Sequence, residues 1–281
     1  MSMRSTVCGW LTLALLVAQP AAPQTARNLE VMSAGHHIAV HVIPGRAPAV
    51  LLDAGGGLDS SYWADLAPKL AKATGSEVIT YDRAGVGASD YVPGPWSLAA
   101  ARDDLTRVLE SLDATHDVIL VSHSLAGEIA LSIATAHPGW FAGAVLVDAN
   151  VPEFFTPAMI ESQLRTYAPM IAALRKAPPT PQTRQLIDVS DSFAETSRTF
   201  HKARWPRSLP LIVIVSEKTP FDEPALAANW KSAHASLAHA AANRQLVTAR
   251  GSSHDVAHDR PDVILAATLA MVRRQSHRRR A

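Results

Sequence analysis

Short apolar runs alternate with longer amphipathic stretches along most of this chain, and no other feature of the sequence limits the fold so strongly. The expected strands fall at 29–32, 38–43, 49–52, 77–81, 118–122, 144–147, 211–215 and 245–247. Helical patterns separate most of them, at 62–73, 98–112, 125–136, 224–242 and 261–274. A strand, a helix and a second strand in succession form a parallel pair with a crossover. The sequence therefore predicts an α/β fold with a doubly wound, mostly parallel sheet.

Two places depart from this alternation at the amino-terminal end. The first two strands flank only the turn residues 33–35, which is typical of an antiparallel β-hairpin. In the helical pattern at 62–73, Pro68 either kinks the helix or marks a late start, since proline lacks an N–H.

The alternation stops between residues 151 and 208, where the chain is rich in Pro, Thr and Gln and shows only short helical stretches. Because the sheet pattern resumes afterwards, we expect a core of 28–150 and 209–275 with a helical cap inserted after the sixth strand. Such a cap covers the carboxyl ends of the strands, where open α/β sheets bind ligands. Its apolar residues either surround a small apolar substrate group or pack the cap itself. These residues are Phe154, Phe155, Met159, Ile160, Leu164, Tyr167 and Met170.

The first residues have the pattern of a secretory signal peptide, predicted to span 1–24. Arg4 precedes an apolar run at 7–18, and small residues and prolines follow it. The run is too short to cross a bilayer comfortably, although an uncleaved anchor is the alternative. We therefore expect export to the periplasm or the extracellular space, with no stable membrane span after signal removal. Cys8, the only cysteine, lies in this segment, which excludes cysteine catalysis in the mature protein.

Charge and motifs exclude several kinds of partner. The formal net charge of +1 indicates no nucleic-acid partner. Five arginines crowd the last nine positions, and we expect a solvated basic tail at 276–281, with polyanion binding as the alternative. No metal-ligand cluster or dinucleotide fingerprint is present, so no cofactor is expected. The predicted partner is a small-molecule substrate, and the oligomeric state is not indicated.

The segment from Ser122 to Gly127, Ser-His-Ser-Leu-Ala-Gly, lies between an expected strand and an expected helix. It resembles the nucleophile elbow of the α/β-hydrolase family, whose usual form is G-x-S-x-G. Ser122 and Ala126 replace the two glycines and are also small. The resemblance implies that Ser124 is the nucleophile, whereas a helix N-cap is the alternative role. A serine here, in place of aspartate, argues against epoxide hydrolase and haloalkane dehalogenase chemistry.

Two glycine-rich segments also resemble that family. Residues 81–89 resemble the family's tyrosine–aspartate–arginine segment at a strand end, and we expect them to form a structural turn without a part in the chemistry. Residues 53–57, Asp-Ala-Gly-Gly-Gly, resemble the loop that usually begins His-Gly. The resemblance implies an oxyanion hole formed by the N–H groups of Gly56 and Leu125. A flexible turn is the alternative for the three glycines.

The general base is predicted from the segment 251–255, Gly-Ser-Ser-His-Asp, which follows the last strand. It is similar to the terminal glycine–histidine segment of the family, which implies that His254 is the base. A serine hydroxyl needs an imidazole to take its proton at neutral pH. His258 is the nearest competitor, and His123 is expected to pack under the elbow.

The triad acid is the open question of the sequence. In most of the family it follows the seventh strand, but Thr219 stands at that position and cannot stabilise an imidazolium by charge. Some haloalkane-dehalogenase-like relatives carry the acid at the end of the sixth strand, where this chain has Asp148. We favour Asp148, with Asp222 or Glu223 as the alternative acid.

The resemblance implies an enzyme, a serine hydrolase that cleaves a carboxylic ester or lactone through an acyl-enzyme, and the apolar cap residues favour a small, mostly apolar substrate. Two alternatives stay open. One is a cofactor-free lyase or C–C bond hydrolase on the same fold. The other is a non-catalytic, hydrolase-like binding protein, which the threonine at position 219 keeps in consideration.

Overall fold

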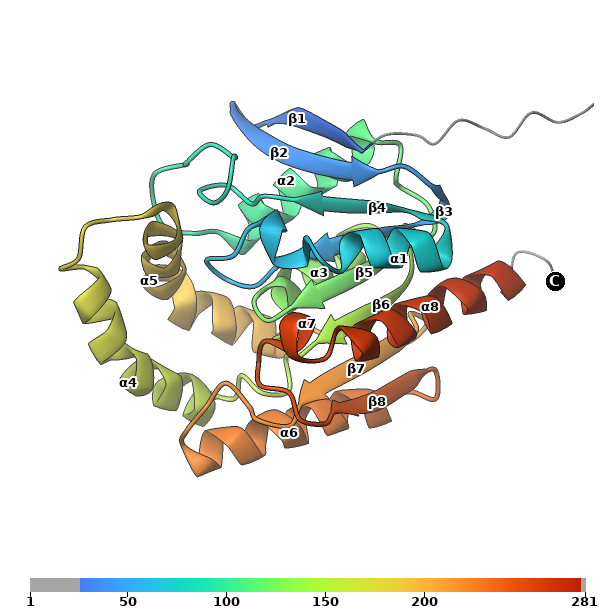
Figure 1. The fold of residues 1–281 in the computed structure, drawn as a ribbon. Helices are drawn as coiled ribbons and strands as arrows, with labels where there is room; N and C mark the ends of the chain where they lie inside the picture. Colours follow the sequence, from blue (N-terminus) through green and yellow to red (C-terminus); the bar gives the residue numbers. More distant parts are fainter. Residues whose placement is uncertain (1–25, 279–281) are drawn as a thin grey trace, which may run out of the picture.

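The computed structural model describes residues 26–278, and the predicted signal peptide lies outside them (Figure 1). Within this part, eight strands form one sheet in the order β1-β2-β4-β3-β5-β6-β7-β8. The strands are β1 (Arg27–Ser33), β2 (His36–Ile43), β3 (Arg46–Asp53), β4 (Ser76–Tyr81), β5 (Val118–His123), β6 (Phe141–Val147), β7 (Leu211–Ser216) and β8 (Arg244–Ala249). β2 pairs antiparallel with β1 and β4, and all other neighbours are parallel. The mostly parallel sheet and the amino-terminal hairpin are thus confirmed.

Helices cover both faces of the sheet (Figure 1). One face carries α1 (Ala67–Thr74), α7 (Val256–Asp259) and α8 (Pro261–Arg278), together with the short 3₁₀ helix η1 (Ser60–Trp63). The other face carries α2 (Leu98–Ser111), α3 (Ala126–Ala136) and α6 (Pro224–His239). Side chains of a strand point alternately to the two faces, so Leu51 joins one apolar core while Val50 and Leu52 join the other.

Two helix boundaries follow from the local sequence. Pro68 lies in the first turn of α1, after a break that separates α1 from η1. It therefore marks a late start, because proline is well tolerated there. At the other end of the chain, α8 continues to Arg278 and includes the first residues of the expected basic tail.

The cap consists of α4 (Pro157–Leu174) and α5 (Pro181–Lys202), inserted between β6 and β7 beside the carboxyl ends of the strands (Figure 1). The prediction of short helical stretches was wrong, because these helices contain 18 and 22 residues. Pro157 and Pro181 begin the two helices, and threonines at 156 and 180 cap them by accepting a hydrogen bond from a main-chain N–H. Part of the Pro and Thr content therefore marks helix starts, whereas Pro169 lies inside α4.

Candidate active site

Ser124 lies in the sharp turn between β5 and α3, at the carboxyl end of the central strands. Its φ of 52° is in the left-handed region, which is uncommon for a residue other than glycine. The turn packs closely on the loop after β6: the Ser124 carbonyl accepts a hydrogen bond from Asn150 N at 2.8 Å, and a Cβ at Gly127 would clash with the Asn150 oxygen. Small residues are required here, and the buried Ala126 meets that requirement in place of a glycine.

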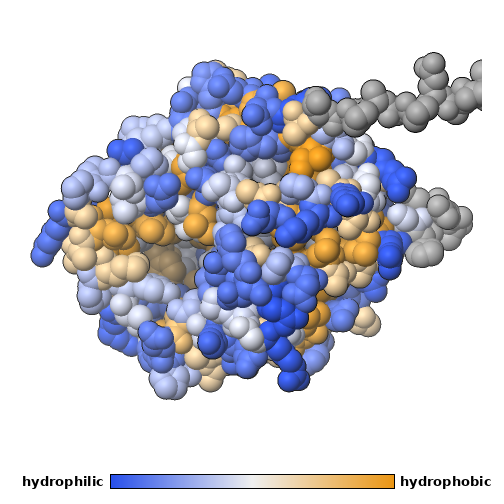
Figure 2. Space-filling view, viewed as in Figure 1, coloured by the Kyte–Doolittle hydropathy of each residue, from blue (hydrophilic) through white to orange (hydrophobic). Residues whose placement is uncertain are grey.

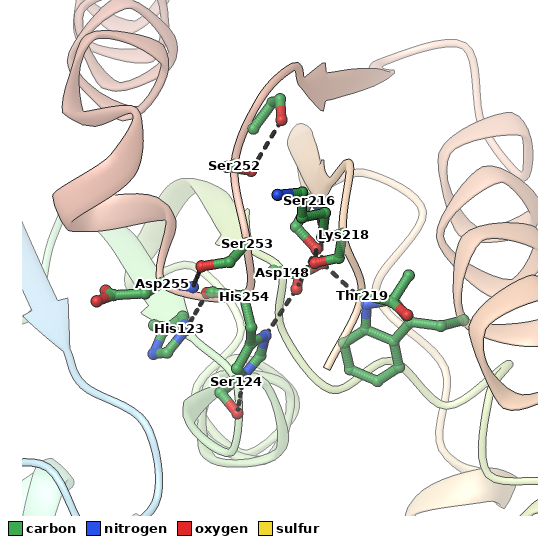
Figure 3. Close-up of polar contacts among 12 residues, drawn as sticks. His123, Ser124, Asp148, Ser216, Lys218, Thr219, Ser252, Ser253, His254 and Asp255 are labelled. Atoms are coloured by element: carbon green, nitrogen blue, oxygen red, sulfur yellow. Dashed lines mark hydrogen bonds and ion pairs between the residues drawn. The ribbon is translucent and has the colours of Figure 1, made fainter. Parts of the chain in front are cut away.

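His254 lies in the loop after β8 and joins two side chains through its two ring nitrogens (Figure 3). Its Nε2 is 3.0 Å from Ser124 Oγ, and its Nδ1 is 2.6 Å from Asp148 Oδ2. Because an ionised carboxylate only accepts, Nδ1–H donates to Asp148, and the lone pair of Nε2 faces the serine hydroxyl. The competing His258 is exposed, with its Nδ1 2.8 Å from Asp255 Oδ1.

Asp148 follows the last residue of β6, and its side chain is fully buried. Besides the imidazole, three donors surround its carboxylate: Ser216 N at 3.0 Å and Trp230 Nε1 at 2.8 Å on Oδ1, and Ser216 Oγ at 2.7 Å on Oδ2. Burial alone would raise the pKa of Asp148, but the hydrogen bond and charge of His254, with the other donors, lower it below its ordinary value. The carboxylate is therefore ionised and able to stabilise a protonated imidazole.

The alternative acids lie elsewhere. Asp222 and Glu223 are exposed at the start of α6, and Glu223 Oε2 accepts a hydrogen bond from Ser162 Oγ at 3.1 Å. Thr219 Oγ1 donates to the main-chain oxygen of Phe221. Among the described residues, Asp148 is the carboxylate that contacts the imidazole.

Ser216 and Trp230 are site residues that the sequence reasoning missed. Thr219 stands at the family's usual acid position after β7, yet Ser216, the last residue of β7, donates two hydrogen bonds to the carboxylate that follows β6. β6 and β7 are parallel neighbours, so their carboxyl ends meet, and the serine at the end of β7 was a usable signal. Trp230 comes from α6, 82 residues from Asp148, and no local pattern indicates its contact.

Gly56 and Leu125 lie against each other beside Ser124. Both line the same cavity as the serine, and a Cβ at Gly56 would lie 3.4 Å from Leu125 Cδ2. Neither N–H donates a hydrogen bond to another residue within 26–278. Both donors are thus available to a ligand oxygen next to the serine.

Arg83 shapes the loop that carries Gly56. Its buried guanidinium pairs with Asp53 and donates to the carbonyl oxygens of Ala54, at 2.5 Å, and Gly55. The sequence predicts only a structural turn for residues 81–89, without a link to the site. These contacts show that Arg83 positions the two residues that precede Gly56.

His123 is buried under the elbow, as expected from the sequence. Burial and the nearby His254 lower the pKa of His123 to about 3, so its ring is uncharged at neutral pH. Its Nε2 lies 3.0 Å from the main-chain oxygen of His254 and donates to it. The neutral imidazole therefore holds the loop that carries His254.

A cavity of about 610 Å³ lies between the cap and the elbow, and Figure 2 shows the surface hollowed at the cap with hydrophobic side chains around the hollow. The apolar cap residues divide between the two roles considered from the sequence. Leu164, Tyr167 and Met170 line the cavity, and Tyr167 also packs against the apolar core. The remaining four pack in or against the apolar core: Phe154, Phe155, Met159 and Ile160.

No group of three or more His, Cys, Asp or Glu side chains within 26–278 is arranged to hold a metal ion. None of the helices in that range is both long and apolar enough to cross a membrane.

Comparisons with known proteins agree with this architecture. The curated protein YqjL of Bacillus subtilis is 25% identical over 220 residues, which cover 76% of this chain and 79% of YqjL. An esterase from Thermogutta terrifontis superposes with a TM-score of 0.65 at 20% identity, covering 88% of this chain and 98% of that one. An esterase from Exiguobacterium antarcticum gives 0.66 at 15% identity, covering 88% and 100%. The family model described as "Alpha/beta hydrolase family" matches residues 49–267, and the chain belongs to this family.

Proposed function

We propose that this protein is a serine hydrolase that cleaves a carboxylic ester or lactone of a small, mostly apolar substrate through an acyl-enzyme. The observation that carries the proposal is the relay from Ser124 Oγ to His254 to Asp148, with contacts of 3.0 and 2.6 Å, in which Ser124 lines the cavity. Esterases are among the solved proteins that share this fold, which supports an ester as the substrate.

The first half of the reaction forms the acyl-enzyme. Ser124 Oγ attacks the carbonyl carbon while His254 Nε2 takes the hydroxyl proton, and the ionised Asp148 stabilises the imidazolium. The oxygen of the tetrahedral intermediate takes up negative charge between the N–H groups of Gly56 and Leu125. On collapse, the bond to the alcohol oxygen breaks, and His254 returns the proton to that oxygen.

The second half regenerates the serine. A water molecule gives its proton to His254 Nε2 and attacks the acyl carbon, which passes through a second tetrahedral intermediate in the same oxyanion hole. Ser124 Oγ leaves with the proton from the imidazolium, and the acid product is released. A lactone follows the same steps with the alcohol and the acid on one molecule.

Hydrolysis of 4-nitrophenyl esters with acyl chains of two to eight carbons tests the proposal. We expect turnover by the wild type and loss of turnover in Ser124→Ala, with a thermal midpoint close to that of the wild type. Retained hydrolysis in Ser124→Ala, or absence of ester and lactone hydrolysis by the wild type, would contradict it.

Export is a second, separate proposal, supported by Arg4 and the apolar run at 7–18. We expect the secreted protein from its native host to begin between about residues 20 and 28. Amino-terminal sequencing measures this directly, and an intact Met1 on the exported protein would contradict cleavage.

A further inference from the structure

A second buried carboxyl group lies at the cavity, and the triad does not use it. Glu128, in the first turn of α3, is 3% exposed and lines the cavity together with Ser124. Its carboxylate has one hydrogen-bond partner within 26–278, Asn150 Nδ2 at 2.6 Å from Oε1. A carboxylate can accept about four hydrogen bonds. Asn150 contacts Oε1, and Oε2 has no hydrogen-bond partner among the described residues.

No cation of the described chain balances this carboxylate. Among the residues that line the cavity, the one basic side chain is Arg175, which is half-exposed and pairs with Asp191. Burial therefore raises the pKa of Glu128 to about 7, against the opposing hydrogen bond from Asn150. The ionised form lacks the positive partner that buried charges usually have.

Other groups that line the cavity also favour a positively charged ligand with N–H donors. Gln163 Oε1 and Ser197 Oγ are buried without hydrogen-bond partners, and both residues line the cavity. Trp96, Tyr167 and Phe193 add three aromatic rings to its wall. The face of an aromatic ring attracts a cation, and free oxygen acceptors bind its N–H groups. An ammonium group in this cavity would balance the charge of the Glu128 carboxylate, next to a wall that also contains unpaired oxygen acceptors and aromatic rings.

We propose that Glu128 binds a protonated amine of the substrate, so that the substrate class is an amino-functionalised ester or lactone of otherwise apolar character. The inference rests on the proposed hydrolysis at Ser124. The ammonium N–H donates to Glu128 Oε2, and the carbonyl lies at Ser124 and the oxyanion hole. Because Glu128 follows Ser124 by four residues and both line one cavity, one small molecule reaches both.

Two pairs of esters matched in shape test this proposal in the wild type at pH 7.5. The first pair compares 2-(dimethylamino)ethyl acetate with 3-methylbutyl acetate, and its charged member carries the amine on the alcohol part. The second pair compares ethyl 4-(dimethylamino)butanoate with ethyl 5-methylhexanoate, and its charged member carries the amine on the acyl part. We expect kcat/KM to favour the amine in one pair by at least about tenfold, as a charged hydrogen bond provides. Equal values in both pairs, or preference for the neutral esters, would overturn the proposal.

Glu128→Gln keeps the shape of the side chain and its acceptor for Asn150 but removes the charge. We expect the amine-to-neutral ratio to fall by about tenfold in this variant. Glu153→Gln is the matched control, since burial also raises the pKa of Glu153 but that residue does not line the cavity. Its ratio should equal that of the wild type. If Glu128→Gln leaves the amine-to-neutral ratio unchanged, the charge of Glu128 does not select the amine, and the proposal is overturned.

The two proposals fail in distinguishable ways. Hydrolysis of the neutral esters without amine preference overturns the role of Glu128 and leaves the proposed function intact. Absence of hydrolysis of all four esters, with no labelling of Ser124, overturns both. The wild-type ratios need no variant, so they decide the matter even where Glu128→Gln does not fold.

Discussion

At the floor of the cavity, β5 and β7 are buried along their whole lengths, whereas the cap helices above bury few side chains. The buried residues of α4 are Ile160, Ser162 and Gln163, and those of α5 are Gln185, Ser197 and Phe200. The proposed catalytic groups lie on the closely packed floor, while most of the cavity wall comes from the cap. The geometry of the proposed catalytic groups thus depends on the sheet, whereas the cap supplies most of the cavity wall.

Backbone conformation shows the same contrast. Ser124 and Asp148 have φ values of 52° and 44°, in the left-handed region that residues other than glycine rarely adopt. Such conformations persist where the surrounding structure holds them in place. We therefore expect substitutions at the floor to have large effects and comparable substitutions in the cap to have small ones.

The largest effect is expected at the acid. Asp148→Asn should lower kcat for a 4-nitrophenyl ester on the order of 10⁴-fold, because the amide favours the wrong imidazole tautomer. Asp222→Asn and Glu223→Gln are controls that should cost far less, since neither side chain contacts His254. An Asp148→Asn variant with nearly wild-type kcat would show that the acid is misassigned.

One ion pair below the cavity and one in the cap allow the contributions of the two regions to stability to be compared. The Arg83–Asp53 side chains are 4% and 3% exposed, whereas those of Arg175–Asp191 in the cap are 47% and 48% exposed. Arg83→Met leaves a buried carboxyl unpaired and should lower the free energy of unfolding by about 3–5 kcal/mol. Arg175→Met should lower it by less than about 1 kcal/mol. Urea denaturation measures both free energies of unfolding. Equal losses in the two variants would contradict the difference between the core and the cap.

The buried segment just before the cap and the cavity-facing side of the cap should also differ in their contribution to stability. Phe154 is 1% exposed and packs edge-on to Trp230 with 4.9 Å between ring centroids, whereas Met170 is 46% exposed. Phe154→Ala should cost about 3–5 kcal/mol of stability. Met170→Ala should cost less than about 1 kcal/mol and change the relative kcat/KM of esters with short and long acyl chains. Unchanged chain-length preference would remove Met170 from the substrate site.

Two carboxyl groups at the floor should respond oppositely to pH. The native pKa of Glu128, about 7, exceeds its ordinary 4.5, so the native state binds a proton that the unfolded state releases between these values. Stability should therefore fall by up to roughly 3 kcal/mol as pH rises from 4.5 through 7. Asp148, with a lowered pKa, stabilises the fold above its ordinary value of 3.8 and loses this effect only on acidification. Urea midpoints at pH 5 and 8 should differ less in Glu128→Gln, and an identical difference would contradict the assignment.

Local patterns were enough to predict the sheet, and the resemblance of two short segments to the family was enough to place Ser124 and His254 just after strands. Each strand is a short buried run, and the elbow needs small residues within two positions of the serine. Residues close together in the sequence are therefore enough to indicate both. Asp148 could only be favoured among alternatives, because its role depends on which strands are neighbours. The contacts of Trp230 and Arg83 join residues 82 and 30 positions apart and lie beyond any local pattern.

The cap was harder to predict for a physical reason. A helix is recognised from the periodicity of the apolar side chains that it buries, and α5 buries just one large apolar side chain, Phe200. Its solvent-facing and cavity-facing residues are mixed in polarity, which weakens that signal. The division of the apolar cap residues between packing and cavity became visible only with both helices in place.

Covalent labelling by a fluorophosphonate tests the central claim, an activated serine at the end of β5, most directly. We expect peptide mapping by mass spectrometry to find the adduct on Ser124 in the wild type. No labelling should occur in Ser124→Ala, and labelling should be strongly slowed in His254→Ala, because the hydroxyl then has no base. A wild-type protein that stays unlabelled, or a Ser124→Ala variant labelled as fast as the wild type, would contradict the assignment of Ser124 as the nucleophile.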